Sequence, residues 1–181
     1  NGLDKKVQMG PMVSEAQQQK VLHYIEIGKK EGAKLILGGS AYKKGGCAYG
    51  SFIEPTIFSD VKPTMRIAKE EIFGPVVVIL PVNNLQEAIK IANDVPFGLS
   101  AAIYSRDVNK TAVAERDLDT GIVYINASTI GAEMQLPFGG TKRTGFGPRD
   151  AGGKGGALDH YTKWKVIYRD YSGRLQKAQI D

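Results

Sequence analysis

The pattern of apolar and polar positions predicts three helices. In the first, an apolar face follows Ser14, a residue type that caps helix starts, and Gly32 lies near the expected end. The apolar face of this helix consists of Val21, Leu22, Ile25 and Ile27. The second and third helices are expected at 85–95 and 108–118, where apolar residues recur at helical spacing. Pro96 ends the earlier of these two, because proline cannot continue a helix.

Short apolar runs between the helices predict strands. They lie at 34–37, 76–80, 99–104 and 121–125, and a glycine-rich surface loop is expected at 42–50. The run 76–80 is wholly apolar, which is typical of a strand that is buried on both faces of a sheet. Strands that alternate with helices favour an α/β layer fold with a largely parallel sheet.

The last stretch of the chain has a different character. Across 161–171, aromatic and β-branched residues roughly alternate with charged ones, which predicts a strand with one face in water. A terminal edge strand of this kind is an association hazard, although its charges reduce that hazard. The polar segment 172–181 is expected on the surface or along a partner.

Composition agrees with this picture and excludes some classes of protein. With 181 residues, of which 42% are hydrophobic and 24% charged, the chain is long enough for one sizeable core. The formal charge of +5 does not predict a nucleic-acid partner, because the basic residues are scattered and form no stripe. No stretch has the length of a membrane span, and the N-terminus does not resemble a signal peptide. We therefore expect a soluble, cytoplasmic protein without a membrane partner.

The first candidate site lies in the run 67–76, which reads Ile-Ala-Lys-Glu-Glu-Ile-Phe-Gly-Pro-Val. Its Gly-Pro turn opens into a predicted strand, so Glu71 and Phe73 stand at the strand entrance. A carboxylate there can accept two hydrogen bonds from a sugar diol, and a phenyl ring can lie against a flat heteroaromatic ring. In isolation, the run is also compatible with a solvated pair of glutamates, Glu70 and Glu71, beside a core phenylalanine.

The second candidate site is the glycine-rich run 135–147, which is too dense in turn formers to predict a helix or a strand. Pro137 restricts one φ angle, and the glycines permit positive φ and close approach of the backbone. A phosphate-binding loop and a flexible linker are the alternatives. Both are weak, because no Gly-Lys-Ser/Thr pattern is present and a linker would hardly carry Phe138 and Phe146.

Together these runs resemble the cofactor motif and the C-terminal signature of the aldehyde dehydrogenase superfamily. Segments 9–14, 31–34 and 52–57 also resemble that family, so the similarity covers nearly the whole chain. The resemblance implies a three-layer, largely parallel sheet with helices on both faces. It also implies a partial catalytic domain over 1–160 and an oligomerisation strand with a C-terminal tail over 161–181.

The resemblance further implies roles for single residues. Glu71 would bind the nicotinamide ribose of NAD or NADP, and Phe73 would pack beside the nicotinamide. Phe138 belongs to the Pro-Phe-Gly-Gly-x-Lys loop that walls the aldehyde tunnel in the family. Ile130 and Glu133 lie in the loop expected to contact the part of the aldehyde remote from the carbonyl, where Glu133 could read a hydroxyl or repel an anion.

Substrate and assembly follow from finer points of the resemblance. The wording of the 127–135 loop and of the C-terminus resembles the branch that oxidises α-ketoglutaric semialdehyde (2,5-dioxopentanoate), and a broad-specificity semialdehyde dehydrogenase is an equal alternative. In the family, the terminal strand joins a sheet that reaches a neighbouring subunit. We therefore expect a homo-oligomer in which Trp164, Val166 and Tyr168 are covered.

The residues needed for oxidation through a thioester are not found in this chain. That chemistry requires a thiolate, a general base, an oxyanion donor and a nicotinamide. The one cysteine, Cys47, lies in the 42–50 loop without a catalytic motif, and we assign it no catalytic role. His23 and His160, without cysteine support, do not predict a metal site. In the family, nucleophile and base precede the segment that matches 1–11.

Asp150 is the remaining candidate for a catalytic role. It matches a family glutamate that positions water and relays protons, but its side chain is one methylene shorter. A local ion pair with Arg149 is an equal alternative. Two functions therefore stay open for the chain. It is either the C-terminal part of an aldehyde dehydrogenase, inactive alone and prone to self-association, or a stand-alone non-catalytic binding or assembly module of that fold.

Overall fold

The computed structural model describes residues 4–131, 133, 136–146 and 156–174. Its longest helix, α1 (Glu15–Lys30), begins where the sequence predicts. The Ser14 hydroxyl oxygen accepts a hydrogen bond from the backbone N–H of Gln17 at 3.2 Å, as an N-cap residue should. The chain leaves the helix through Gly32, whose φ of 91° is favourable for glycine.

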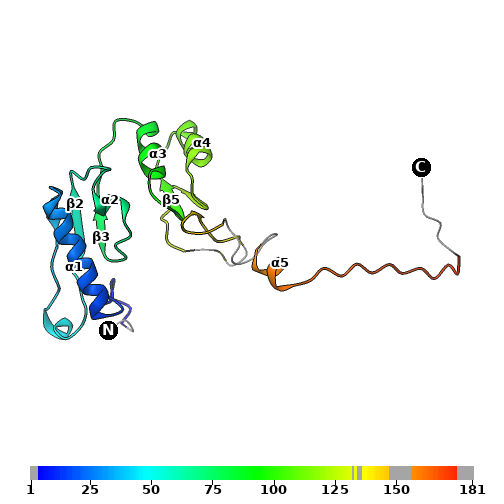
Figure 1. The fold of residues 1–181 in the computed structure, drawn as a ribbon, viewed down its shortest axis with the longest axis horizontal. Coiled ribbons are helices and arrows are strands. Elements are labelled where there is room, and N and C mark those ends of the chain that lie inside the picture. The colour runs from blue at the N-terminus through cyan, green and yellow to red at the C-terminus, as the bar shows by residue number, and fades with distance from the viewer. Residues whose placement is uncertain (1–3, 132, 134–135, 147–155, 175–181) are drawn as a thin grey trace.

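The remaining elements match most of the expected positions within one or two residues (Figure 1). They are β1 (Lys34–Leu37), η1 (Gly45–Cys47), β2 (Thr56–Ser59), α2 (Arg66–Lys69), β3 (Val76–Val78), α3 (Leu85–Asn93), β4 (Phe97–Gly98), β5 (Ser100–Ile103), α4 (Val108–Asp117), β6 (Ile122–Ile125), β7 (Thr141–Lys142) and α5 (Ala157–Tyr161). One difference is β7, a two-residue strand inside the glycine-rich run, where neither helix nor strand was expected.

The strands form three small sheets in the described part of the chain, and not the continuous, largely parallel sheet with helices on both faces that was expected. The first sheet has the order β1–β2–β3, the second pairs β4 with β7, and the third pairs β5 with β6. The mixed α/β class is therefore confirmed, while the three-layer arrangement is not seen.

The connections explain which pairs are parallel. β2 and β3 are parallel and joined through α2, and β5 and β6 are parallel and joined through α4. Parallel neighbours need a crossover connection, which a helix commonly supplies. β1–β2 and β4–β7 are antiparallel, so alternation of strands and helices predicted the direction of only two of the four pairs.

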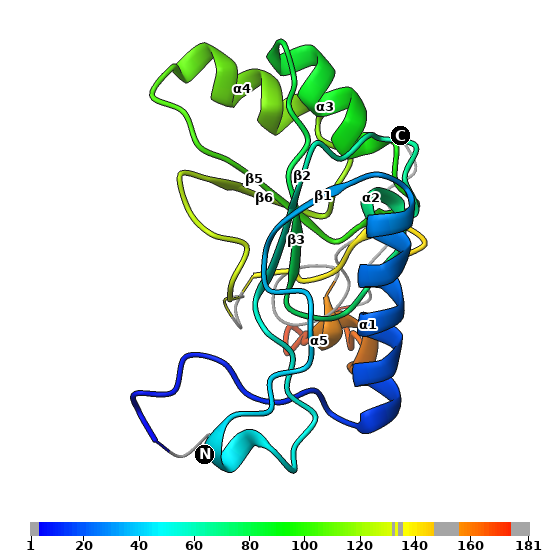
Figure 2. The ribbon, with the colours of Figure 1, turned by 90° about the vertical axis from the view of Figure 1, so that its left-hand side faces the viewer.

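The core lies between α1 and one face of the first sheet (Figure 2). Phe58 on β2 is 0% exposed and packs in a cluster with Val21 and Ile25 of α1 and Ile67 of α2. The other buried apolar members of the cluster are Ala33, Ile53, Val61, Met65 and Ile72. Burial of this face fixes α1 and α2 against the sheet, and with them the start of the first candidate site.

The opposite face of the first sheet is apolar but uncovered. Leu37, Ile57 and Val77 are in register across β1, β2 and β3, and register partners point to the same face. Leu37 is 52% exposed and Val77 is 57% exposed. The expectation that 76–80 is buried on both faces is therefore wrong for this chain, because no described element packs on that side.

The C-terminal stretch extends away from the rest of the described chain (Figure 1). After α5, residues 162–171 form no strand, because a strand requires a hydrogen-bonded partner and the described residues offer none. Trp164 and Tyr168 are 88% and 93% exposed in the single chain. Their coverage by a neighbouring subunit stays a prediction. Among the helices of the described residues, none is both long enough and apolar enough to cross a membrane.

Candidate functional site

The two glutamates of the first candidate site have different environments. The Glu70 carboxylate accepts hydrogen bonds from two other side chains of the fold. The Arg66 guanidinium donates to both of its oxygens at 2.7 and 2.8 Å, and the Tyr24 hydroxyl donates another hydrogen bond at 2.8 Å. The Glu31 carboxylate accepts from the backbone N–H of Arg66 at 3.0 Å and so holds the start of α2. This network ties α2 to α1 immediately before Glu71.

The hydrogen bonds that Glu70 accepts predict a pH-dependent stability. Arg66 first, and then Tyr24, lower the pKa of Glu70 from 4.5 to about 2. A carboxylate with a depressed pKa contributes stability that is present above its unfolded pKa and is lost as the pH falls through its folded pKa. We therefore expect the urea midpoint of the chain to fall between pH 4.5 and about 2, and to fall less in Glu70→Gln.

Glu71→Gln is the matched control for this measurement, because the Glu71 side chain has no arginine partner among the described residues. We expect the urea midpoint of the control variant to fall with pH as much as that of wild type. If the midpoint of Glu70→Gln also falls as much as that of wild type, the Arg66–Glu70 pair does not contribute to stability.

Glu71 and Phe73 point to solvent. Glu71 is exposed, and its side chain makes no hydrogen bond within the described ranges of the chain. Phe73 is 73% exposed, so it is not a core residue in this chain. An exposed carboxylate and an exposed phenyl ring lie two residues apart at the entrance of β3, as the sequence predicts, and the interpretation of Glu70 and Glu71 as an unbound solvated pair fails for Glu70.

The backbone of Phe73 adopts an uncommon conformation. Its φ is 55°, in the left-handed region that bulky residues rarely occupy. Such strained positions persist where the surrounding structure holds them, and they cluster at functional sites. Gln17 of α1 supplies this support, because its side-chain amide donates to the Ile72 carbonyl at 3.2 Å and to the Phe73 carbonyl at 2.9 Å. Sequence reasoning missed Gln17, since no local signal links it to residues 72 and 73.

The next residue brings the same loop close to α1. A Cβ atom on Gly74 would lie 2.5 Å from Cγ2 of Val21, so only glycine fits this approach without a shift. The Gly-Pro turn is thus required by packing as well as by the turn itself. Together, Gln17 and Val21 hold the segment that carries Phe73.

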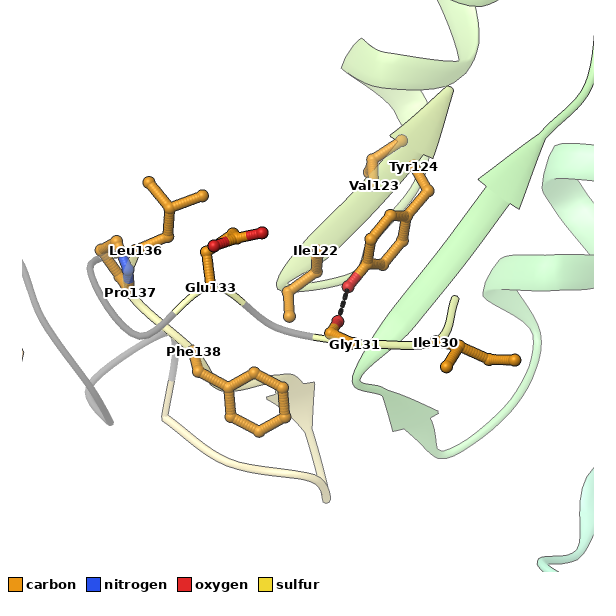
Figure 3. Close-up of a pocket in the computed structure, with 9 residues that line it drawn as sticks. All are labelled: Ile122, Val123, Tyr124, Ile130, Gly131, Glu133, Leu136, Pro137 and Phe138. Atoms are coloured by element: carbon orange, nitrogen blue, oxygen red, sulfur yellow. Dashed lines mark hydrogen bonds between the residues drawn. The ribbon is translucent and has the colours of Figure 1, made fainter. Parts of the chain in front are cut away.

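The second candidate site is a pocket of about 450 Å³ beside β6 (Figure 3). It is lined by Ile122, Val123, Tyr124, Ile130, Gly131, Glu133, Leu136, Pro137 and Phe138. The structure thus brings together Ile130, Glu133 and Phe138, the three residues expected at the substrate. Glu71 and Phe73 do not line this pocket; they lie on the segment between α2 and β3.

Tyr124 is a pocket residue that sequence reasoning missed. Its hydroxyl donates a hydrogen bond of 2.6 Å to the Gly131 carbonyl and so fixes the loop across the pocket (Figure 3). The strand pattern places Tyr124 on β6, but only the fold shows which loop it meets. The pocket is mostly apolar, and Glu133 is its one charged lining residue among those described.

Close backbone contacts and a lysine position the glycine-rich run beside β6. A Cβ atom on Gly121 would overlap the Gly139 carbonyl oxygen, so a glycine is needed immediately before this strand. Lys142 donates a hydrogen bond of 2.9 Å from Nζ to the Asn93 carbonyl, and its Nζ lies 3.6 Å from Asp119. These contacts anchor the run immediately after Phe138.

The other candidate residues do not join either site. Cys47 lies in η1, half-buried, and His23 and His160 lie on α1 and α5. Asp150 lies outside the described residues, so its role stays a prediction. Within the described ranges, no three histidine, cysteine, aspartate or glutamate side chains gather closely enough to hold a metal ion.

Comparison with known proteins agrees with the family resemblance that the sequence motifs indicate. Residues 1–167 match the model of the aldehyde dehydrogenase family. Over 168 residues, the chain is 41% identical to alpha-ketoglutaric semialdehyde dehydrogenase of Bacillus subtilis (strain 168), with 93% of this chain and 34% of that protein covered. It is 45% identical to betaine aldehyde dehydrogenase of Brucella anthropi, with 92% and 33% covered. The chain thus spans about a third of the length of these curated relatives.

Solved structures agree. Betaine aldehyde dehydrogenase from Staphylococcus aureus in complex with NAD+ is 37% identical with a TM-score of 0.83, and the match covers 89% of this chain and 31% of that one. A 1-pyrroline-5-carboxylate dehydrogenase from Thermus with bound NAD is 46% identical with a TM-score of 0.69, and the match covers 74% and 25%.

Proposed function

The chain belongs to the aldehyde dehydrogenase family, and from this premise we propose that it is the C-terminal part of the catalytic domain of an NAD- or NADP-dependent aldehyde dehydrogenase. In this role it supplies contacts to the cofactor's ribose and nicotinamide, one wall of the substrate site and contacts between subunits. It does not supply the nucleophile or the general base. The proposal implies that the chain alone does not oxidise aldehydes.

The observation that carries this proposal is the pairing of Glu71 and Phe73 at the entrance of β3. Glu71 offers an exposed carboxylate without a partner among the described residues, and such a group can accept hydrogen bonds from both hydroxyls of a ribose. Phe73 offers an exposed ring that can lie against the nicotinamide. Glu70, one residue earlier, is occupied by Arg66 and Tyr24 and cannot serve in the same way.

The chemistry divides between the cofactor and the chain. When bound, the cofactor would supply the acceptor for the hydride that is removed when the aldehyde is oxidised to the acid. Glu71 and Phe73 would orient the ribose and ring, and the pocket beside β6 would hold the organic part of the aldehyde. The thiolate that forms the thioester is expected outside this chain, because Cys47 lies in η1, on a separate element from Glu71, Phe73 and the pocket beside β6.

The finer choice of substrate concerns the sign of its charge. We keep a semialdehyde, such as α-ketoglutaric semialdehyde, as the first candidate, because the amino-acid sequence of the 127–135 loop resembles that branch of the family. A cationic aldehyde is the second candidate, because the described lining contains one carboxylate, Glu133, and two aromatic rings, Tyr124 and Phe138. Carboxylates attract cations and repel anions, and aromatic faces bind quaternary ammonium groups.

Activity measurements test the proposal. The purified 181-residue chain is to be compared with the longest polypeptide that carries this sequence in the source cells, identified by its intact mass. We expect the longer polypeptide to reduce NAD or NADP with an aldehyde, and the 181-residue chain to show no turnover. Comparing kcat/KM for α-ketoglutaric semialdehyde and betaine aldehyde then decides the sign of the substrate charge.

Two results would contradict the proposal. Turnover by the 181-residue chain alone would show that the catalytic groups are present in it. If native material contains only a chain of this length, and that chain shows no turnover, the non-catalytic binding or assembly module becomes the better explanation.

A further inference from the structure

One side chain of α1 donates hydrogen bonds on both sides of the left-handed Phe73. Phe73 has a φ of 55°, and the Gln17 amide nitrogen lies 3.2 Å from the Ile72 oxygen and 2.9 Å from the Phe73 oxygen. We propose that Gln17 is a positioning residue, which holds Phe73 in this conformation and thereby aims its ring at the nicotinamide. This inference rests on the proposed function.

The geometry explains why one amide can hold both carbonyls. Along an extended strand, successive carbonyls point to opposite sides, so a single side chain cannot reach two in a row. A left-handed residue between them turns both toward the same side. The Gln17 amide carries two N–H donors, one for each carbonyl, and lies opposite them on α1. We call these two hydrogen bonds the carbonyl fork. Without them, Phe73 could relax to negative φ, which bulky residues prefer.

Val21, one turn further along α1, adds a second point of support. Residues four apart share one face of a helix, so Gln17 and Val21 face the same segment. Val21 packs so closely on Gly74 that a Cβ atom there would overlap it. The carbonyl fork and this packing together seat residues 72–74 on α1, while the Phe73 ring stays 73% exposed.

The carbonyl fork requires an amide at position 17, because both hydrogen bonds need an N–H donor. A glutamate at position 17 has the same shape, but its ionised carboxylate accepts hydrogen bonds and cannot donate to carbonyls. An alanine removes the group altogether. Gln19, two residues along the same helix, is exposed and makes no side-chain hydrogen bond in the described part of the chain, so it offers a matched control.

Two measurements test the inference in Gln17→Glu, Gln17→Ala and the controls Gln19→Glu and Gln19→Ala. The first is the NMR cross-peak between the amide and α protons of Phe73, in the labelled 181-residue chain. These protons are closest at positive φ, so we expect a strong peak in wild type and controls and a weakened peak in both Gln17 variants. The second is the Kd of NADH for the longer polypeptide. We expect it to rise about tenfold in the Gln17 variants, or about 1.4 kcal/mol, and to be unchanged in the controls.

The outcomes separate this inference from the proposed function. An unchanged Phe73 peak in Gln17→Glu would overturn the inference, and so would a weakened peak with an unchanged Kd. Glu71→Ala serves as the reference for the site in the same titration. If Glu71→Ala weakens NADH binding and Gln17→Glu does not, the positioning role alone is wrong. If neither variant changes the Kd, the proposed cofactor role is wrong and the inference falls with it.

Discussion

Replacing Glu71 by alanine is expected to weaken binding of NAD or NADP to the longer polypeptide that is proposed to carry this chain by about 1.5–3 kcal/mol, which is roughly a 10- to 100-fold rise in Kd. The reason is that hydrogen bonds to a charged acceptor are stronger than neutral ones, and the bound ribose would be left without its acceptor. Stability should change by less than about 0.5 kcal/mol, because the exposed side chain has no partner among the described residues.

Titration of NADH fluorescence and urea denaturation measure the two quantities on one preparation. Glu115→Ala is the matched control, since Glu115 is an exposed glutamate on α4, outside both candidate sites. Glu70→Ala should give the opposite pattern to Glu71→Ala, with a loss of stability from breaking the Arg66–Glu70 pair. An unchanged Kd in Glu71→Ala would show that the ribose is bound by another group.

Replacing Phe58 by alanine is expected to lower the free energy of unfolding by about 3–5 kcal/mol. Phe58 is fully buried on the central strand of the first sheet, where it belongs to one cluster with residues of α1 and α2. Its loss leaves a cavity that the helices cannot close without breaking their contacts with the sheet. Because whole domains are stable by only about 5–15 kcal/mol, this variant should be largely unfolded at modest urea concentrations.

Phe146→Ala is the matched control, because the same side chain is removed from a residue that is 93% exposed. We expect that variant to unfold within about 0.5 kcal/mol of wild type. Phe58→Leu, which keeps most of the buried volume, should fall between the two and remain measurable if Phe58→Ala does not fold. Far-UV circular dichroism in urea gives all three values. Equal stability of the three proteins would place the core elsewhere.

Much of the local structure follows from local signals in the sequence. Ser14 caps α1 at the residue expected, and β1 spans the four residues expected, because caps and short apolar runs act through neighbours in the chain. The βαβ unit of β5, α4 and β6 was also predictable, since a helix between two apolar runs favours parallel pairing. The same holds for placing Glu71 and Phe73 at the entrance of a strand.

Burial was less predictable, because it depends on what covers a face. The run 76–80 has the composition of a strand covered on both sides, yet Val77 is 57% exposed and only three residues join β3. An apolar composition indicates that a segment is stable when it is buried, but it does not show which element buries it. The same reason applies to 162–171, whose alternation indicates a strand while the single chain gives it no partner.

The sequence by itself determined the family resemblance, the helices and most strands, and which residues could bind a cofactor or line a pocket. Only the tertiary structure decided how these residues are used. It separates Glu70, held by Arg66 and Tyr24, from Glu71, which faces solvent. It also places Gln17 against a left-handed Phe73. The hydrogen bonds Tyr24–Glu70 and Gln17–Phe73 join residues 46 and 56 positions apart, and no local pattern in the sequence predicts a contact at such separation.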